Sequence, residues 1–513
     1  MMKKKYFSYI LLLLVVVILF AAAAVASPDG EFFVNDEFTL LPRNFEGVYA
    51  IGSGGTDLLV SGNLYALTSS GRQRLGAAAV IGGGGLTDDP EPVKLNGDHV
   101  KVGLAYNFAE ARDCSVPSAT IVNTGGGGFS FGYYDEYEDF VVLASADDDT
   151  LTVRPGPDSA VDVFSHGESA PVFTFEESSK DSYLFVRPEP FEEQPLIRYA
   201  GISYRGEFCF AVLSNDRLTV VNYVDLDSYI MGVCAIEMTE SWPLEALKAQ
   251  AVAARTFVQR MIGSSVYYYG CGFDVTADTF TQAYHGTRGV GDNIVVAVEE
   301  TANQYLTQNG ALIEALYSAS DGGATEDSEN IFGYPNSYLI GVPDPFEEYA
   351  EEENPYSSWT VTMTPAQLGS CVGIGPVESV EPTYSRMGNV IKLEFVSTSG
   401  QTAVLLRDNC RTRLGLNSIR YEISIDDRGY FVFEGSGCGH NLGMSQWGAY
   451  AMAKYFDKDY RFILGYYYTD VSMSLGELPP KPERPQIDEP AEPEPDEPEP
   501  DEMNTPAELS RPA

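Results

Sequence analysis

Short runs of alternating hydrophobic and polar residues dominate the first half of the chain. Between residues 95 and 165, β-branched or aromatic runs separated by turn residues occur at 99–105, 118–122, 128–132 and 140–143. This pattern predicts short strands, so we expect a small β-rich domain over residues 96–165. Residues 27–95 hold glycine clusters and short apolar stretches, which predict strands and irregular structure of unassigned role.

A different periodicity begins after residue 240. Leu244, Leu247, Ala251, Ala254 and Val258 recur at steps of 3, 4, 3 and 4, the spacing of a buried helical stripe. We expect this long helix to have Ser241 as its N-cap and Pro243 in its first turn, and to end near Gly263.

Helical patterns also appear at 291–304 and 444–456, and strand-like runs at 204–212 and 218–224. We therefore predict an α+β domain over residues 200–475, with a mixed sheet of short strands and one long helix. The proline-containing stretch 165–198 is interpreted as a connector.

The first 26 residues resemble an export signal. Lys3, Lys4 and Lys5 precede a 17-residue apolar run from Ile10 to Ala26 that ends in small residues. A cleaved signal peptide is our first interpretation, and a membrane anchor formed by residues 6–26 is the alternative. In both cases the rest of the chain is expected outside the cytoplasm.

The opposite end of the chain is acidic and rich in proline. Residues 479–513 contain 11 Pro, 11 acidic and 3 basic residues, a composition that predicts a disordered tail. The whole chain carries 32 Lys+Arg against 74 Asp+Glu, a formal charge of −42. This charge argues against nucleic acid as a partner, because phosphate binding needs clustered basic residues.

Cysteine and histidine are sparse in an otherwise aromatic chain. The 7 Cys include no CxxC pair, and the 4 His are dispersed. A disulfide framework is not indicated, although one or two bridges stay open. No cofactor and no metal site is predicted.

Glu237 is the first candidate for catalysis. It lies between Ile236 and Met238, just before the long helix, where apolar neighbours would raise its pKa and the positive end of the helix would lower it. A role as a simple partner of the helix dipole is the alternative interpretation. Lys248 and Arg255, seven residues apart on the polar face of that helix, would either be solvated or bind a polar substrate.

Two further segments contain clustered polar side chains. Residues 435–448 form a glycine-rich loop with His440, Ser445, Gln446 and Trp447, in which backbone could approach a ligand and the indole could stack on a sugar. Residues 317–328 form a polar turn cluster whose acidic residues do not fit the spacing of a calcium loop. A Ser318–His440–Asp321 triad is disfavoured because the Gly-x-Ser-x-Gly elbow is absent.

At these segments the chain resembles the SpoIID/LytB family of bacterial cell-wall proteins. The resemblance extends from Leu218 to Ala449 through the motifs around Glu237, the long helix, Gln282-Ala-Tyr284-His-Gly, Tyr317-Ser318-Ala-Ser320-Asp-Gly-Gly and Gly439-His440-Asn-Leu-Gly-Met-Ser445-Gln446-Trp447. It implies lytic transglycosylase activity on peptidoglycan glycan strands stripped of peptide stems, in a process linked to sporulation.

The resemblance assigns the catalytic glutamate to Glu237. It implies a substrate groove lined by Lys248, Arg255, Tyr284, Tyr317, Ser318, Ser320, His440, Ser445, Gln446 and Trp447. One acid would suffice, because the 6-hydroxyl of the sugar itself attacks; Asp225, Asp227, Asp321 and Glu326 remain alternatives for a second acid.

The resemblance leaves two points open. Another branch of the family enhances an amidase, so a non-catalytic wall-binding module is the alternative function, with other cell-wall or sporulation proteins as further expected partners. Some members also carry a Cys/His zinc site before the Gln-x-Tyr motif, whereas here Cys271 stands alone and His285 follows the motif; we therefore predict no zinc site there.

Overall fold

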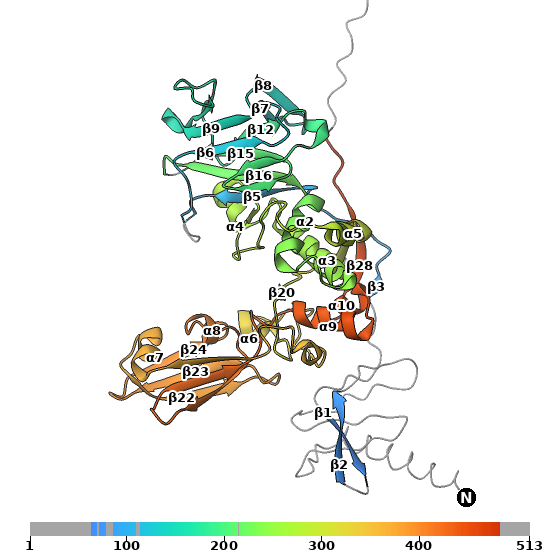
Figure 1. The fold of residues 1–513 in the computed structure, drawn as a ribbon, viewed down its shortest axis with the longest axis vertical. Coiled ribbons are helices and arrows are strands. Elements are labelled where there is room, and N and C mark those ends of the chain that lie inside the picture. Colours follow the sequence, from blue (N-terminus) through green and yellow to red (C-terminus); the bar gives the residue numbers. More distant parts are fainter. Residues whose placement is uncertain (1–62, 69–70, 78–85, 109–112, 214, 483–513) are drawn as a thin grey trace, which may run out of the picture.

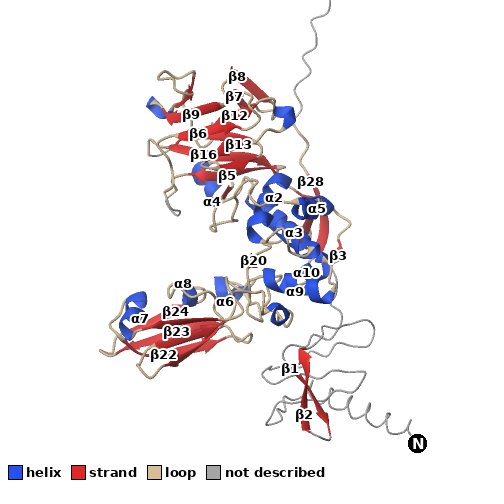
Figure 2. Cartoon of the chain, in the orientation of Figure 1, coloured by secondary structure: helices blue, strands red, loops and turns tan. Residues whose placement is uncertain are grey.

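The computed structural model describes residues 63–68, 71–77, 86–108, 113–213 and 215–482. Three parts follow one another in Figure 1: a β-rich part, a central group of helices, and a second β-rich part that contains β22–β24. Figure 2 shows that strands and helices are both abundant, with most of the larger helices gathered in the central part. The predicted α+β class is confirmed.

Two sheets form the first part. The six-stranded sheet has the order β11 (Phe173–Phe175), β10 (Val161–Ser165), β9 (Thr150–Pro155), β6 (Ala119–Asn123), β13 (Ile197–Tyr199) and β14 (Ile202–Tyr204). The seven-stranded sheet has the order β17 (Val275–Thr276), β5 (His99–Ala105), β16 (Leu218–Asp225), β15 (Glu207–Val212), β12 (Leu184–Pro188), β7 (Phe129–Tyr134) and β8 (Phe140–Ala146). Side chains such as Val153, Val163, Phe208 and Phe210 belong to one core shared by both sheets.

The second sheet joins segments on both sides of the expected connector at 165–198. β5 pairs antiparallel with β16, so that Val102 lies opposite Asn222, and the connector itself contributes β12. Residues 96–165 therefore share a sheet with residues 207–225 and 275–276, because hydrogen bonding between distant strands is invisible to local patterns.

Helices surround α3 (Leu244–Met261) in the centre of the molecule. They are α2 (Leu226–Glu237), α5 (Asp292–Glu300), α9 (Gln446–Phe456) and α10 (Tyr460–Tyr467). A small sheet completes this part, with the order β19 (Ala311–Leu312), β18 (Gln304–Gln308), β28 (Ser472–Glu477) and β3 (Thr87–Asp88), while β4 (Val93–Lys94) also pairs with β28. Shorter elements are α4 (Val266–Cys271), α6 (Ser328–Phe332) and β1–β2 (Asn63–Thr68, Gly71–Ala77).

The third part has a separate hydrophobic core, which includes Leu368, Leu393, Phe395 and Phe433. One of its sheets has the order β21 (Trp359–Met363), β26 (Phe431–Gly435) and β25 (Tyr421–Ile425). The other has the order β22 (Val377–Tyr384), β23 (Val390–Ser397) and β24 (Thr402–Leu406), with α7 (Pro365–Val372) and α8 (Asn409–Thr412) nearby.

The predicted helices are present, with shifted boundaries. The long helix is α3, whose N-cap is Pro243 rather than Ser241, and the patterns at 291–304 and 444–456 correspond to α5 and α9. The sequence did not predict α2 or α10. α2 buries Leu226, Tyr229, Ile230, Val233 and Cys234, and burial on several sides removes the amphipathic pattern by which a helix is recognised.

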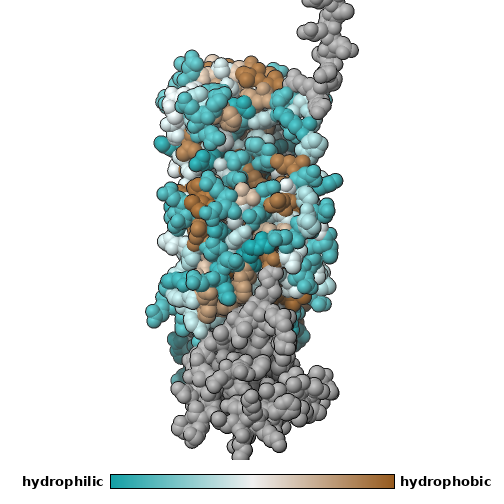
Figure 3. All heavy atoms as spheres, turned by 90° about the vertical axis from the view of Figure 1, so that its right-hand side faces the viewer, coloured by the Kyte–Doolittle hydropathy of each residue, from teal (hydrophilic) through white to brown (hydrophobic). Residues whose placement is uncertain are grey.

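The two predicted terminal segments, 1–26 and all but the first residues of 479–513, lie outside the described residues. Within the described part of the chain, no helix combines the length and the apolar character needed to cross a membrane. One face of the molecule is mostly hydrophilic, with small separate hydrophobic patches (Figure 3).

Candidate active site

Glu237 is the last residue of α2. Asp225 begins this helix as its N-cap, accepting a hydrogen bond of 2.9 Å from the backbone N–H of Ser228, and extended Met238 ends it. Glu237 therefore lies at the C-terminal, negative end of α2, and six residues separate it from the first residue of α3. The helix end closest in sequence disfavours a carboxylate, which is opposite to the effect expected from the long helix alone.

The Glu237 carboxyl group is held by two hydrogen bonds. Gln446 Nε2 donates to its Oε2 at 3.0 Å, and a backbone hydrogen bond comes from Ala283. Burial raises the pKa of Glu237, and both hydrogen bonds oppose this effect. Glu237 as a residue is partly exposed, while burial of its carboxyl group favours the protonated form.

The position of Gln446 depends on two short strands that are distant in sequence. β20 (Tyr317–Ser318) pairs in parallel with β27 (Met444–Ser445). Ser445 then caps α9 by accepting a hydrogen bond from the Gly448 N–H at 3.2 Å, which starts the helix at Gln446. Gln446 Nε2 also donates to Gln250 Oε1 of α3 at 3.3 Å, so that α2, α3 and α9 meet at Glu237.

Tyr317 belongs to the same cluster. Its hydroxyl accepts a hydrogen bond from Gln282 Nε2 at 2.9 Å, and Gln282 Oε1 accepts one from Tyr229 of α2 at 3.1 Å. Burial and the nearby Glu237 charge raise the pKa of Tyr317. Gln282 was not among the site residues predicted from the sequence. The signal for it was available, because Gln282 is the first residue of the Gln282-Ala-Tyr-His-Gly motif.

His440 lies on the loop that precedes β27 in the chain. Its Nδ1 accepts a hydrogen bond from the Leu442 N–H at 3.0 Å, and it forms a backbone hydrogen bond with Tyr317. Burial, followed by the charge of Arg411, lowers the pKa of His440 to about 4. The imidazole is therefore neutral at pH 7 and holds the loop against β20.

Lys248 and Arg255 share one side of α3, as predicted, but that side faces α5. Lys248 pairs with Glu245 and Glu300, each at 2.7 Å. Lys248 and Gln250 are two residues apart, which on a helix places them on nearly opposite faces, and Gln250 is the residue that reaches the Glu237 cluster.

Arg255 is fully buried and closes the C-terminal end of α5. It donates to the carbonyl oxygens of Thr301 at 2.9 Å and Val298 at 3.2 Å, and to Asp227 at 3.3 Å. A cation in this position neutralises the negative end of α5. The structure thus gives Arg255 a role in packing α5 on α3 and does not bring it to Glu237.

Four other predicted groove residues are buried. The Tyr284 hydroxyl donates to Asn222 at 2.8 Å within the core, and Ser320 accepts a hydrogen bond from Asn354 at 3.2 Å. Ser318 and Ser445 face each other across β20 and β27. Their side chains support the backbone of the site, and no described hydrogen bond joins Ser318, His440 and Asp321 into a triad.

Trp447 directly follows Gln446 in the chain and belongs to a cluster of three aromatic rings. Its ring centroid lies 4.8 Å from that of Trp242 and 5.0 Å from that of Tyr450. Trp242 and Trp447 are both partly exposed. Such rings provide the flat apolar surface on which a pyranose ring can stack.

The four other acidic residues considered in the sequence have different partners. Asp225 caps α2, Asp227 binds Arg255, and Glu326 accepts hydrogen bonds from Asn330, Ser385 and Asn389. Asp321 lies in a buried group with Asp344 and Glu347. Within the described ranges, no second carboxylate forms a hydrogen bond with Glu237.

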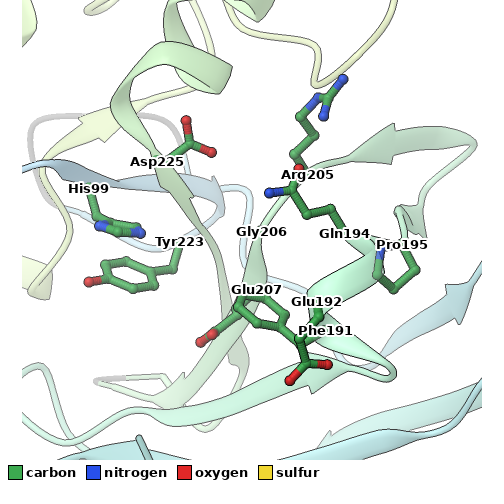
Figure 4. Close-up of a pocket in the computed structure, with 10 residues that line it drawn as sticks. All are labelled: His99, Phe191, Glu192, Gln194, Pro195, Arg205, Gly206, Glu207, Tyr223 and Asp225. Carbon is green, nitrogen blue, oxygen red and sulfur yellow. The ribbon is translucent and has the colours of Figure 1, made fainter. Parts of the chain in front are cut away.

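A cavity of about 300 Å³ lies elsewhere, in the first β-rich part. Figure 4 shows His99, Tyr223, Phe191 and Arg205 around it, together with Asp225. Asp225 and Glu237 lie at opposite ends of α2, which is roughly 18 Å long at 1.5 Å per residue. Apart from Asp225, one of the alternatives for a second acid, the cavity is lined by none of the predicted site residues.

The cysteines are not arranged as a zinc site in the described part of the chain. Cys271 Sγ contacts the backbone carbonyl of Asn107 at 3.6 Å, and no disulfide joins the seven cysteines. Asp321, Asp344 and Glu347 are the group whose oxygen atoms come within 4.8 Å of one another.

Comparisons with known proteins agree with this arrangement. Residues 214–308 match the family described as SpoIID, Stage II sporulation protein, a range that contains Glu237 and all of α3. The chain is 30% identical to the Stage II sporulation protein D of Bacillus subtilis over 276 residues, which is 50% of this chain and 76% of that protein.

Two other relatives extend the comparison. An uncharacterised protein of Brachyspira hyodysenteriae is 34% identical over 294 residues, covering 55% of this chain and 75% of the relative. The amidase enhancer of Bacillus subtilis is 27% identical over 347 residues, covering 57% of this chain and only 47% of the relative. From the family match, these identities and their coverage, the chain belongs to the SpoIID/LytB family.

Proposed function

We propose that this protein cleaves peptidoglycan glycan strands as a lytic transglycosylase, in a role linked to sporulation. The observation that carries the proposal is the environment of Glu237. Glu237 is a partly exposed residue whose carboxyl group has a raised pKa and is oriented by Gln446, and no second carboxylate among the described residues forms a hydrogen bond with it.

A single carboxyl group can perform both proton transfers of this reaction. Protonated Glu237 would donate its proton to the glycosidic oxygen as the bond from that oxygen to the sugar C1 breaks. The resulting carboxylate would then accept the proton of the 6-hydroxyl, whose oxygen bonds to C1 and closes a 1,6-anhydro ring. Glu237 regains its proton, and no water is consumed.

The surroundings of Glu237 suit both stages of the reaction. Burial favours the acid before cleavage, while the Gln446 and Ala283 donors stabilise the carboxylate afterwards. The partly exposed Trp242 and Trp447 rings, packed against Tyr450, offer a surface for a sugar. A peptide-free strand is also the substrate least repelled by a chain of net charge −42.

Export is part of the same proposal. We propose that the N-terminal apolar run, with its preceding lysines, directs the protein out of the cytoplasm to the cell wall. Peptidoglycan is then its partner, and other cell-wall or sporulation proteins are further partners to be sought.

The test is digestion of peptide-free glycan strands by the wild type and Glu237→Gln. We expect 1,6-anhydro-muramyl ends from the wild type and a decrease of about 10²–10⁴-fold in the variant. The control is Glu299→Gln, which changes an exposed glutamate of α5 and should retain full activity. Hydrolytic reducing ends, without the anhydro ring, would identify a muramidase instead.

The relative named amidase enhancer supports a second candidate function. In that case the protein would bind glycan strands and stimulate a separate amidase without cleaving them. Strand binding without cleavage by either the wild type or Glu237→Gln, together with stimulation of an added amidase, would establish this alternative.

A further inference from the structure

Three buried carboxyl groups come together near the chain segment that follows β20. Asp321 follows β20, Asp344 lies on the loop that leads to a 3-10 helix (Glu347–Ala350), and Glu347 begins that helix. One oxygen atom from each lies within 4.8 Å of the others, and all three residues are buried, with exposures of 0%, 1% and 4%.

Most of the carboxylate oxygens have donors. Asp321 Oδ1 accepts a hydrogen bond from the Gly323 N–H at 2.7 Å, and Asp344 Oδ2 accepts one from the Tyr467 hydroxyl at 2.5 Å. Glu347 accepts hydrogen bonds from the Gly322 N–H at 2.8 Å and from Asn354 at 3.1 Å. Asp321 Oδ2 is the exception, because no donor among the described residues reaches this buried atom. The Asp321 side chain also lies within hydrogen-bonding range of the Glu347 carboxyl group, and only a shared proton or a cation could make that contact favourable.

The charges in this cluster do not balance. Three ionised carboxyl groups contribute −3, and Arg420, the nearby cation, contributes +1. The Arg420 guanidinium donates instead to the backbone carbonyl of Met387 at 2.8 Å. Buried charges without a partner are very costly, so two further positive charges are required.

We propose that Asp321, Asp344 and Glu347 bind one divalent cation of the oxygen-preferring class, with Ca²⁺ as the occupant to be tested. The ligand set contains only oxygen, which suits Ca²⁺, Mg²⁺ or Mn²⁺ and does not suit zinc. Ligand distances of about 2.3–2.6 Å place three oxygens around one ion at spacings up to roughly 4.5 Å, and the three oxygen atoms here lie within 4.8 Å of one another. The unpaired Asp321 Oδ2 would become a ligand, and the cation would bring the net charge to zero.

The cation site would connect two segments of the candidate active site, namely the segment after β20 and the start of α9. Asp344 Oδ2 lies so close to Gly448 that a Cβ there would collide with it and with the Tyr467 hydroxyl. Gly448 is in the first turn of α9, which starts at Gln446, while Asp321 is on the segment after β20. The bound cation would thus fix the start of α9 relative to β20, whether or not the protein cleaves glycan.

The competing explanation for the charge balance is that the carboxyl groups share two protons. The pH dependence of stability distinguishes these protons from a bound cation. A carboxyl group must be deprotonated to bind a cation, so protons and Ca²⁺ compete for the same oxygen atoms and cation binding weakens as pH falls. The other charged and titratable groups that face the cluster are Arg420, Tyr466 and Tyr467. Ca²⁺ should therefore stabilise the protein much more at pH 8 than at pH 5.

The experiment measures thermal unfolding of the full chain with Ca²⁺ or EDTA. At a hundredfold excess over its Kd, Ca²⁺ should raise the Tm of the wild type at pH 8 by about 4 °C, and equilibrium dialysis in high salt should retain one Ca²⁺ per chain. Asp321→Asn should lose both effects. Glu352→Gln, which changes an exposed glutamate five residues after Glu347, should keep them.

Two outcomes would overturn the proposal. Absence of a Ca²⁺ effect on the wild type, with Asp321→Asn more stable than the wild type at pH 8, would show that protons balance the cluster. Equal responses of the wild type and Asp321→Asn would place the ion on the acidic surface. If Asp321→Asn does not fold, Asp344→Asn and the dialysis of the wild type decide the question. None of these measurements uses strand cleavage, so a failure here is distinct from failure of the proposed function.

Discussion

Gln446 is the residue on which the chemistry of Glu237 most directly depends. Its Nε2 donates to Glu237 at 3.0 Å and so favours the carboxylate, while burial favours the acid. The balance between these effects sets the pH range in which Glu237 can give and then recover a proton. If the proposed cleavage takes place, Gln446 acts on it through Glu237.

Gln446→Met should raise the pKa of Glu237, because it removes a donor to the carboxylate. The alkaline limb of the pH profile of strand cleavage should move upward, and the maximal rate should fall by about 10–100-fold through lost orientation. Gln446→Glu should move the alkaline limb further, since a second carboxylate repels the charged form. A downward shift in either variant would contradict the assigned role.

His440 provides a second prediction at this scale. Its pKa is lowered from 6.5 to about 4 by burial, so the folded state favours the neutral ring. That contribution to stability is complete above pH 6.5 and is lost as pH falls towards 4. The Tm difference between wild type and His440→Gln should therefore be constant above pH 7 and decrease below pH 6.5, as followed by thermal unfolding. A constant difference from pH 7 to pH 4 would contradict it.

The sequence identified several of these residues but not their functions. Gln446 and Tyr317 lie near Glu237, and His440 is linked to them through the backbone of Tyr317. Lys248 and Arg255 do not reach Glu237, because periodicity shows which residues share a helix face and cannot show what that face contacts. The buried acids were equally hidden, since their ligand atoms come from segments 23 and 26 residues apart in the chain.

At the scale of elements, α3 is the part on which the site is assembled. One face of α3 places Gln250 next to Gln446, and the opposite face holds α5 through Lys248 and Arg255. α5 is capped from outside at both ends, since Glu240 accepts hydrogen bonds from the Asn293 and Ile294 N–H groups at 2.8 and 3.2 Å. Helix α5 therefore fixes the segment that follows Glu237.

Substitutions on the two cationic residues of α3 should separate structural from substrate-binding roles. Arg255→Met should lower the free energy of unfolding by about 3 kcal/mol, because buried carbonyls lose a charged donor. Lys248→Met should lower it by about 1 kcal/mol or less, as expected for an ion pair near the surface. Denaturant unfolding measures both.

Cleavage assays on the same two variants test the assignment. At a temperature where both remain folded, each should cleave strands within about threefold of the wild-type rate, because neither side chain reaches Glu237. A large loss of activity with unchanged stability would restore the substrate-binding interpretation of that residue.

At the scale of the whole molecule, the site is assembled from parts that are distant in sequence. The strand pattern and the long helix were predictable, because they are local. The sharing of one sheet by residues 99–105 and 218–225, and the meeting of β20 with β27, depend on contacts across more than a hundred residues. The sequence thus predicted the class and many elements but not the sheet that crosses the expected domain boundary.

The large negative charge leads to a prediction about substrate choice. Peptide stems carry carboxylates, so at low salt an acidic protein should cleave stem-bearing strands more slowly than bare ones. Raising the salt from about 0.01 to 0.5 M screens this repulsion and should accelerate cleavage of stem-bearing strands several-fold more than that of bare strands. Steady-state rates on the two substrates, compared at each salt concentration, provide the measurement; equal salt responses would remove charge as the cause.

The pairing of β20 with β27 has a consequence for when the protein becomes active. The strand pair cannot form until residues 444–445 have been added to the chain. The whole third part, with its own core, lies between the two strands in the sequence. Gln446 reaches Glu237 only after that pairing. A nascent chain that ends before residue 444 therefore lacks the Gln446 donor to Glu237, so under the proposed function strand cleavage would begin only after the third part of the protein has been made.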